Sequence, residues 1–338
     1  MKEMKREAYF DNAKIILIFL VVFGHMIQPF TDGSKPMYTL YMWIYTFHMP
    51  AFIFLAGFFA KGSGNKGYIA KLAKKLIFPY IVFQVIYTIF YFFIGKDGWM
   101  TTPFHPHWSL WFLFSMFCWH VLLQLFSKIP PMIGLALSVT IGIVIGYASD
   151  IGHTYSLSRT FVFFPFFLAG YWLTKDQVAK WRTKQVKVAS VIVMAIVAGV
   201  IAYAPEFSSG WFLGSKSYAV LDLPNSGGLA RLGVYMLAGI MTVAVLAWIP
   251  VKGSRISVLG QRTLYVYLLH GFLIQFFRQA DVFHVDNVID VIGLAAVSAI
   301  IVLLLSTRIV LTISQPLIEG QMKHLKRYFS SKNVQENN

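Results

Sequence analysis

Long, almost uncharged apolar runs recur along nearly the whole chain, and they limit its fold more than any other feature. Many approach the roughly 20 residues needed to cross a bilayer. Only 13% of the 338 residues are charged, whereas about a quarter of an ordinary soluble domain is charged. A segment inside a bilayer must satisfy its own backbone hydrogen bonds, and the alternating pattern of barrel strands is absent. The sequence therefore predicts an all-α, polytopic membrane protein.

About ten segments have the composition of membrane-spanning helices. They are predicted at residues 15–31, 37–60, 76–95, 108–126, 132–149, 160–174, 188–204, 230–250, 263–280 and 288–313. Together they define one transmembrane domain over residues 15–313, preceded by a charged segment 1–14 and followed by a polar tail 314–338. No small-residue cleavage site follows the first apolar run, so we expect it to be a retained helix and not a signal peptide.

Basic residues are distributed unevenly between the two sets of loops. An even number of spans places both termini on one side, and 23 of the 29 Lys and Arg residues fall on that side. The positive-inside rule therefore places both termini in the cytoplasm and the chain in the cell membrane as a multi-pass protein. Because the charges lie in short loops between apolar spans, the net charge of +15 indicates membrane topology and not nucleic-acid binding.

One ionisable side chain lies deep in the first predicted span. His25 follows Lys14 by eleven residues, which is about 16 Å along a helix axis. If Lys14 marks the cytoplasmic surface, His25 lies near the bilayer midplane, where ionisable groups are costly and tend to mark sites or pathways. Two interpretations remain open: a neutral imidazole hydrogen-bonded to a neighbouring helix, or a catalytic group.

Three lysines precede the third span, in the stretch YIAKLAKKLIFPY. Lys71 lies three and four residues before Lys74 and Lys75, so all three share one helical face. They are either a topology signal or a cluster that binds a polyphosphate.

Three more ionisable residues lie in or beside apolar segments. His48 is close to Pro50, and proline removes a backbone donor and can open the helix there. Arg159 precedes the run TFVFFPFFLAGYWL and either extends to the interface or points inward. His270 is a further imidazole within the ninth span.

The stretch HPHWSLWFLFSM contains a pair of histidines and two tryptophans. His105 and His107 have the spacing of metal ligands, but no Cys, Asp or Glu is near them in the sequence, so no metal is expected. Trp108 and Trp111 fit an interfacial aromatic belt or the wall of a binding site. The chain also lacks the GxSxG, Walker and HExxH motifs, so it shows no familiar hydrolase or ATPase apparatus.

Taken together and in this order, several stretches resemble the acyltransferase-3 family of bacterial membrane proteins. They are YFDNAK followed by His25, FHMPAFIFLAGF, the lysines ahead of LIFPY, WSLWFLFSM, SRTFVFFPFFLAGY and LYVYLLHGFLI. SRTFVFFPFF is most similar to the fucose 4-O-acetylase-like branch. The chain departs from many relatives in having lysine where they have arginine, and we do not expect the extracytoplasmic domain that is fused to some relatives.

The resemblance implies transfer of an acyl group, usually acetyl, from cytoplasmic acetyl-CoA or another acyl-CoA to a carbohydrate hydroxyl beyond the membrane. His25 would be the general base or would accept the acyl group as a relay. Asp11 would orient Lys14, or cap the first helix. The remaining roles are acyl-CoA binding by Lys14, Lys71, Lys74 and Lys75, and oxyanion binding or channel lining by His48, Arg159, His270 and Trp111.

Two other classes of function compete with this interpretation. A proton-coupled exporter of a sugar or lipid-linked glycan would also contain intramembrane histidines, although no Asp or Glu is predicted deep within a span. A partner-binding membrane subunit is the other alternative, and some relatives work within envelope-glycan machinery. Consumption of acyl-CoA favours the enzyme, whereas substrate movement into liposomes without acyl-CoA favours the exporter.

Overall fold

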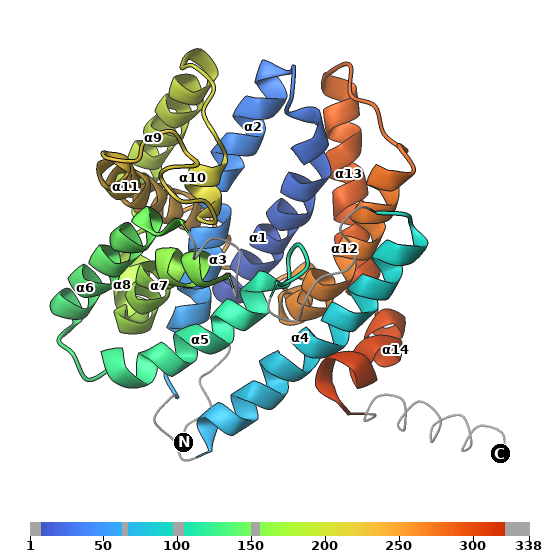
Figure 1. The fold of residues 1–338 in the computed structure, drawn as a ribbon, viewed down its shortest axis with the longest axis horizontal. Helices are drawn as coiled ribbons and strands as arrows, with labels where there is room; N and C mark the ends of the chain where they lie inside the picture. Colours follow the sequence, from blue (N-terminus) through green and yellow to red (C-terminus); the bar gives the residue numbers. More distant parts are fainter. Residues whose placement is uncertain (1–7, 63–66, 97–104, 150–155, 322–338) are drawn as a thin grey trace.

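The computed structural model describes residues 8–62, 67–96, 105–149 and 156–321, and these residues form helices without any strand. Figure 1 shows the helices packed around α1, which lies at the centre of the molecule. The predicted all-α fold is therefore confirmed. The helices are α1 (Ala8–Ile27), α2 (Lys35–Tyr45), α3 (His48–Phe58), α4 (Tyr68–Phe93), α5 (Trp111–Phe126), α6 (Pro131–Val144), α7 (Leu157–Trp172), α8 (Lys175–Lys180), α9 (Lys184–Tyr203), α10 (Gly210–Leu213), α11 (Gly227–Leu246), α12 (Thr263–Gln279), α13 (Val288–Leu305) and α14 (Arg308–Glu319).

Each of the ten predicted segments contains a helix, and six of these segments, with α2 and α3 together counting as one, are long and apolar enough in the described structure to cross a membrane. The others, α5, α6, α7 and α12, contain 16, 14, 16 and 17 residues. At about 1.5 Å per residue they are shorter than a hydrocarbon core of roughly 30 Å. The structure therefore confirms a polytopic membrane protein, while the number of ten spans and the cytoplasmic termini stay predictions.

The molecular surface supports the same conclusion, because the usual distribution of polarity is reversed. Apolar side chains such as Ile192, Ile196 and Val200 of α9 are exposed, whereas Arg231 and His270 are buried. Lipid tails are apolar, so an apolar exterior costs nothing in a bilayer, and ionisable residues face the interior of the helix bundle.

The second predicted span is divided into α2 and α3 at residues Thr46 and Phe47. Pro50 is the third residue of α3, where its missing N–H is one of the donors that a helix start leaves unpaired. The predicted opening near His48 is confirmed, and His48 becomes the first residue of α3. Thr46 compensates locally, because its hydroxyl donates to the carbonyl oxygen of Trp43 at 2.7 Å.

The predicted end of the last span at residue 313 is wrong. Helix α13 ends at Leu305, and α14 begins at Arg308 after a cap in which the Thr307 hydroxyl accepts a hydrogen bond from the Val310 N–H. Serine and threonine compete with helical backbone bonding and favour such caps. Helix α14 packs against α4 and continues through Glu319, across the predicted boundary between membrane domain and tail.

Close packing of α3 on α7 fixes the helices on one side of α1. The two helices approach at Gly57 and Gly170, where an added Cβ would lie 1.9 Å from the carbonyl oxygens of Phe167 and Phe54 respectively. Small residues allow such backbone approach in membrane proteins, where packing and not the hydrophobic effect holds helices together. The sequences LAGFF and LAGYW therefore specify this contact.

Replacing Gly57 with alanine should separate α3 from α7 and destabilise the protein by about 1–3 kcal/mol, since backbone atoms must move to admit the methyl group. Gly199→Ala is the matched control, because no atom lies within 4 Å of that Cβ position. Thermal unfolding in detergent should show a lower melting temperature for Gly57→Ala alone. Equal melting temperatures would show that the close contact does not limit stability.

Candidate active site

His25 lies in the last turn of α1, two residues before the helix ends at Ile27. Because α1 begins by Ala8, before Lys14, the imidazole lies toward the Gln28 end of the helix. Its predicted depth near the bilayer midplane stays a prediction. Its side chain is half-buried. We refer below to the Lys14 end and the Gln28 end of the molecule.

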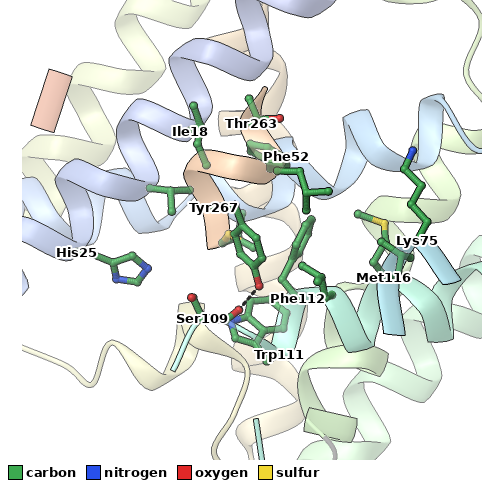
Figure 2. A pocket seen from close by; sticks show the side chains of 15 residues that line it. Ile18, His25, Phe52, Lys75, Ser109, Trp111, Phe112, Met116, Thr263 and Tyr267 are labelled. Atoms are coloured by element: carbon green, nitrogen blue, oxygen red, sulfur yellow. Dashed lines mark hydrogen bonds between the residues drawn. The ribbon is translucent and has the colours of Figure 1, made fainter. Parts of the chain in front are cut away.

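A cavity of about 220 Å³ leads from His25 toward the Lys14 end. Figure 2 shows the His25 imidazole and the Lys75 amine at opposite ends of it. Its wall is formed by Ser109 and by side chains of five helices. Besides His25 and Lys75, the helical residues are Ile18, Val21, Met49, Phe52, Leu76, Trp111, Phe112, Leu113, Met116, Thr263, Leu264 and Tyr267. Most of this wall is hydrocarbon, so the cavity suits a long, largely apolar ligand with a charged end at Lys75.

Polar groups are concentrated near His25. Ser109 lines the cavity, and its buried hydroxyl has no hydrogen-bond partner within the described residues. The Tyr267 hydroxyl donates a short hydrogen bond to the Ser109 carbonyl oxygen and so joins α12 to the start of α5. A buried hydroxyl without a partner is costly, and the amide or thioester carbonyl of a bound ligand would satisfy it.

The three predicted lysines have different positions. All three are exposed on α4, but only Lys75 lines the cavity. Lys71 and Lys74 lie nearer the start of α4 and do not contribute to the wall. The structure therefore separates residues that helical spacing alone had grouped together.

Asp11 and Lys14 lie at the opposite end of α1 from His25. The Lys14 amine lies 3.2 Å from an Asp11 carboxylate oxygen and 5.0 Å from the centre of the Phe59 ring. Asp11 precedes His25 by fourteen helical residues, about 21 Å. The predicted pairing of Asp11 with Lys14 is present, whereas a catalytic contact of Asp11 with His25 is not; Asp11 positions Lys14.

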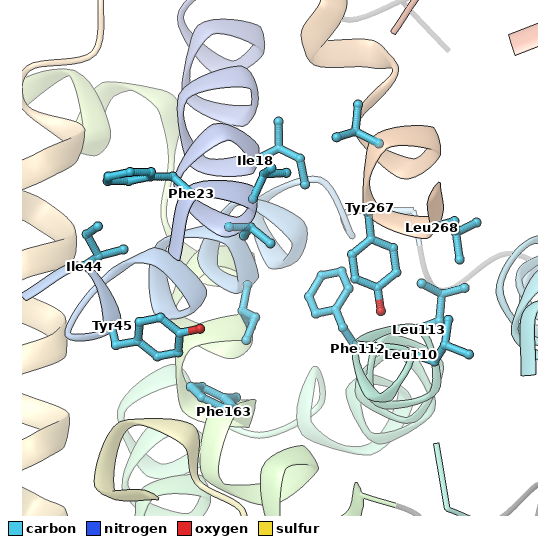
Figure 3. Packing of buried hydrophobic residues seen from close by; sticks show 14 of the residues in the cluster. Ile18, Phe23, Ile44, Tyr45, Leu110, Phe112, Leu113, Phe163, Tyr267 and Leu268 are labelled. Carbon is cyan, nitrogen blue, oxygen red and sulfur yellow. The ribbon is translucent and has the colours of Figure 1, made fainter. Parts of the chain in front are cut away.

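Aromatic residues from three separate segments surround His25. Its ring centre lies 4.3 Å from that of Trp108 and 5.7 Å from that of His270. The Tyr45 hydroxyl lies 3.4 Å from His25 Nδ1. In Figure 3 Tyr45 extends from the end of α2 into the centre of the molecule, across from Tyr267 and Phe112. With Tyr45 at Nδ1, the Nε2 atom is left for contact with a ligand.

His48 and His270 share one arrangement. In each, Nδ1 lies 3.0 Å from the carbonyl oxygen four residues earlier, Ile44 for His48 and Val266 for His270. A carbonyl only accepts, so Nδ1 donates and Nε2 of the neutral ring is an acceptor. His48 packs on Tyr45, with ring centres 4.3 Å apart, and His270 packs on His25. Both therefore support the His25 neighbourhood.

Two guanidinium groups approach the same centre. Arg159 stacks on Trp111 with its Cζ 4.9 Å from the ring centre. Arg278 donates a short hydrogen bond to the His25 carbonyl oxygen and a second bond, of 3.0 Å, to Gln28 Oε1. The Nε atoms of both arginines are buried without a partner, and in the described parts of the chain neither guanidinium forms an ion pair with a carboxylate. The site is therefore suited to stabilise developing negative charge.

Trp108 has a strained backbone, with φ of 36°. A bulky residue in this left-handed region costs roughly 1–3 kcal/mol and recurs at functional sites. The conformation places the indole against His25, and Gly271 makes room for it, since a Cβ there would lie 2.7 Å from the Trp108 ring. Close packing against the Trp108 ring therefore explains why residue 271, directly after His270, is a glycine.

The other sequence features are structural or do not form a site. His107 Nε2 lies 2.8 Å from the Thr88 hydroxyl, and the His107 backbone N–H donates to Gln84 Oε1. His107 therefore holds the segment before α5 against α4. His105 is exposed. Among the residues that the structure describes, no group of three His, Cys, Asp or Glu side chains could hold a metal ion.

Sequence reasoning missed Tyr45, Arg278 and Tyr267. A tyrosine in an aromatic-rich span has no distinguishing signal, and an arginine at the end of an apolar segment resembles an interfacial anchor. Only the contact between segments separated by 253 residues, as for Arg278 and His25, reveals the role.

Comparison with known proteins gives the same assignment as the geometry. The model of a family described as an acyltransferase domain matches residues 7–308. Nodulation protein NolL of Mesorhizobium japonicum is 24% identical over 302 residues, covering 79% of this chain and 76% of the relative. NolL of Sinorhizobium fredii is 24% identical over 316 residues, covering 84% and 82%. No solved structure matches the chain.

The family match spans nearly the full length of the chain and includes each stretch on which the resemblance was based. A membrane acyltransferase also accounts for an apolar cavity with a lysine at one end, which leads to a histidine near two guanidiniums that form no ion pair with a described carboxylate. The chain belongs to the acyltransferase-3 family.

Proposed function

We propose that the protein is a cell-membrane O-acetyltransferase that transfers acetyl from cytoplasmic acetyl-CoA to a carbohydrate hydroxyl on the extracytoplasmic side. The observation that carries this proposal is the cavity that joins Lys75 to His25. An apolar lining between Lys75 and His25 suits a donor whose phosphates remain outside the membrane while its acyl end reaches the interior.

The donor end of the cavity supports binding of coenzyme A. Its phosphates are anionic, and Lys75, the one of the three predicted lysines that lines the cavity, supplies a positive charge at the mouth. The pantetheine arm would occupy the hydrocarbon-lined passage, with the Ser109 hydroxyl available to one of its carbonyl groups. This orientation brings the thioester to His25.

His25 is the group proposed to drive transfer. With Tyr45 at Nδ1, His25 Nε2 takes the proton of the acceptor hydroxyl as its oxygen bonds to the thioester carbonyl carbon. The carbon–sulfur bond breaks, and the departing thiolate takes up that proton. Alternatively, Nε2 first attacks the thioester carbonyl carbon and expels the coenzyme A thiolate. The acceptor hydroxyl then attacks the acetyl-imidazole, its proton passes to that thiolate, and the carbon–nitrogen bond breaks to restore the neutral imidazole. Rapid quenching and peptide mass measurement distinguish these routes by an acetyl group on His25.

Arg159 is the proposed group that stabilises the oxyanion. Its guanidinium lies within electrostatic range of His25, Tyr45 and Tyr267, and no described carboxylate neutralises it. A fixed cation whose charge is uncompensated in the ground state favours the tetrahedral intermediate over the neutral thioester.

The overall proposal is tested by mass spectrometry of cell-envelope glycans from cells with and without the gene. We expect an acetyl ester to be lost with the gene and restored by the wild-type protein. Purified protein should also consume acetyl-CoA only when an acceptor is supplied. Substrate movement into liposomes that needs no acetyl-CoA would contradict the proposal.

Replacing Lys75 with alanine should raise the KM for acetyl-CoA about tenfold, because a contact to a charged group contributes roughly 1.5–3 kcal/mol. Lys71→Ala is the matched control, since Lys71 lies on the same helix and is exposed but does not line the cavity. Initial rates over a range of acetyl-CoA concentrations measure both. Equal KM values for the two variants would remove Lys75 from the donor site.

A further inference from the structure

A second cavity, of about 380 Å³, lies at the Gln28 end of α1. Its wall comes from the end of α1 with the turn that follows, and from the end of α12 with its following loop. The residues that define its chemistry are Gln28, Phe30, Phe277, Arg278, Asp281 and Phe283. None of the groups proposed to bind the donor or to stabilise the oxyanion lines it.

The two cavities occupy successive stretches of the same pair of helices. The donor cavity contacts α1 up to His25 and α12 up to Tyr267, whereas the outer cavity begins at Met26 on α1 and at Phe277 on α12. Both helices run from the Lys14 end toward the Gln28 end (Figure 1). The outer cavity therefore approaches His25 from the side opposite to the donor.

Arg278 lies between the outer cavity and His25 and contacts both. It lines the outer cavity, and its guanidinium donates to the His25 carbonyl oxygen and to Gln28. Its Nε is buried and has no partner in the described part of the chain. A donor in this place can bind a ligand in the outer cavity while it bonds the backbone of His25.

The lining also indicates the class of ligand. One guanidinium and one carboxylate give no excess of either charge, which favours a neutral ligand over a phosphate or a carboxylate. The amide of Gln28, the carboxylate of Asp281 and the guanidinium of Arg278 are hydrogen-bonding partners for hydroxyl groups. Three phenyl rings provide apolar surface for the C–H faces of a ring.

Asp281 is further distinguished by its backbone. Its φ is 47°, in the left-handed region that Asp and Asn tolerate better than other residues. The conformation places it at the rim of the cavity, where its side chain is 84% exposed and lies 3.7 Å from His284. The carboxylate is therefore accessible to a ligand that enters from the Gln28 end.

We infer that the outer cavity is the acceptor site and that it holds one neutral pyranose unit. The phenyl rings would pack on the sugar ring, and Arg278, Gln28 and Asp281 would bind its hydroxyl groups, so that one hydroxyl faces His25. This inference rests on the proposed acetyltransferase function and adds the place and the chemical class of the acceptor.

The experiment uses purified full-length protein, acetyl-CoA and a panel of neutral methyl hexopyranosides, each paired with the alditol that has the same hydroxyl configuration but no ring. We expect acetyl esters on a pyranoside and not on its alditol. Phe283→Ala and Asp281→Asn should each raise the KM for that pyranoside about tenfold and leave the KM for acetyl-CoA unchanged. Asparagine tolerates the backbone of Asp281, so this variant should remain folded.

Two comparisons keep the inference falsifiable. Phe283→Tyr should restore the wild-type KM, and Phe93→Ala, at an exposed phenylalanine outside the cavity, should not change it. Transfer with an unchanged pyranoside KM in Phe283→Ala and Asp281→Asn, or equal transfer to the alditol, would overturn the acceptor site while leaving the enzyme intact. Failure of the wild type to acetylate any hydroxyl compound would instead contradict the proposed function on which it rests.

Discussion

Replacing His25 with alanine should lower kcat by about 10²–10⁴-fold, the range expected for loss of a general base. If the imidazole carries the acetyl group itself, the loss should be at least as large, because His25 is the one imidazole among the residues that line the cavity. The KM for acetyl-CoA should change little, since Lys75 and the hydrocarbon wall remain. Rates of ester formation by purified protein in detergent provide the measurement.

The matched control for this variant is His105→Ala, which removes an exposed loop imidazole outside both cavities. Both variants should insert into the membrane and accumulate like the wild type, because the bond from Arg278 to the backbone carbonyl oxygen of residue 25 does not need the imidazole. Transfer by His25→Ala at more than a tenth of the wild-type rate would end the catalytic assignment. A Tyr45→Phe variant should lose less activity, because it removes only the group at His25 Nδ1.

Replacing Arg159 with methionine should lower kcat by about 10²–10³-fold, the usual consequence of removing a donor to a developing oxyanion. Arg159→Lys should recover only part of this activity, because lysine retains the charge but not the planar fork that stacks on Trp111. The KM for both substrates should remain close to wild type. Steady-state kinetics with separately varied substrates distinguishes this pattern from a binding defect.

Arg255→Met is the control for loss of a single arginine, because Arg255 is exposed in the loop before α12. It should retain the wild-type kcat and melting temperature. If Arg159→Met instead raised the KM for acetyl-CoA while leaving kcat unchanged, Arg159 would be a donor-binding residue. Such a result would move the oxyanion role to Arg278, the other guanidinium beside His25.

Helical spacing predicted which lysines share a face of α4, but not which of them lines the cavity that leads to His25. Spacing placed Lys71, Lys74 and Lys75 on one face, and that placement depends only on 3.6 residues per turn. The choice of Lys75 depends on the rotation of α4 relative to α5 and α12, whose side chains form the other walls of the cavity. Local periodicity contains no information about that rotation.

The surroundings of His25 likewise combine a residue that the sequence distinguishes with residues that only the structure identifies. His25 stands out in the sequence because an ionisable side chain in an apolar run requires a reason. Arg278 and Tyr45 do not stand out, because arginine and tyrosine are common at the ends of membrane helices. Like Trp108, for which the sequence left a belt or a binding wall open, they matter here because distant segments bring them within contact of His25.

By itself, the sequence determined that the chain forms membrane helices, that His25 belongs to the first of them, and to which family the ordered stretches belong. These features follow from backbone hydrogen bonding and apolar length, which are local properties of each segment. Only the tertiary structure decided that Lys75, and not Lys71 or Lys74, lines the cavity that leads to His25, and that α1 and α12 line two successive cavities. Those features depend on side-chain packing between segments far apart in the chain, which no single stretch of sequence specifies.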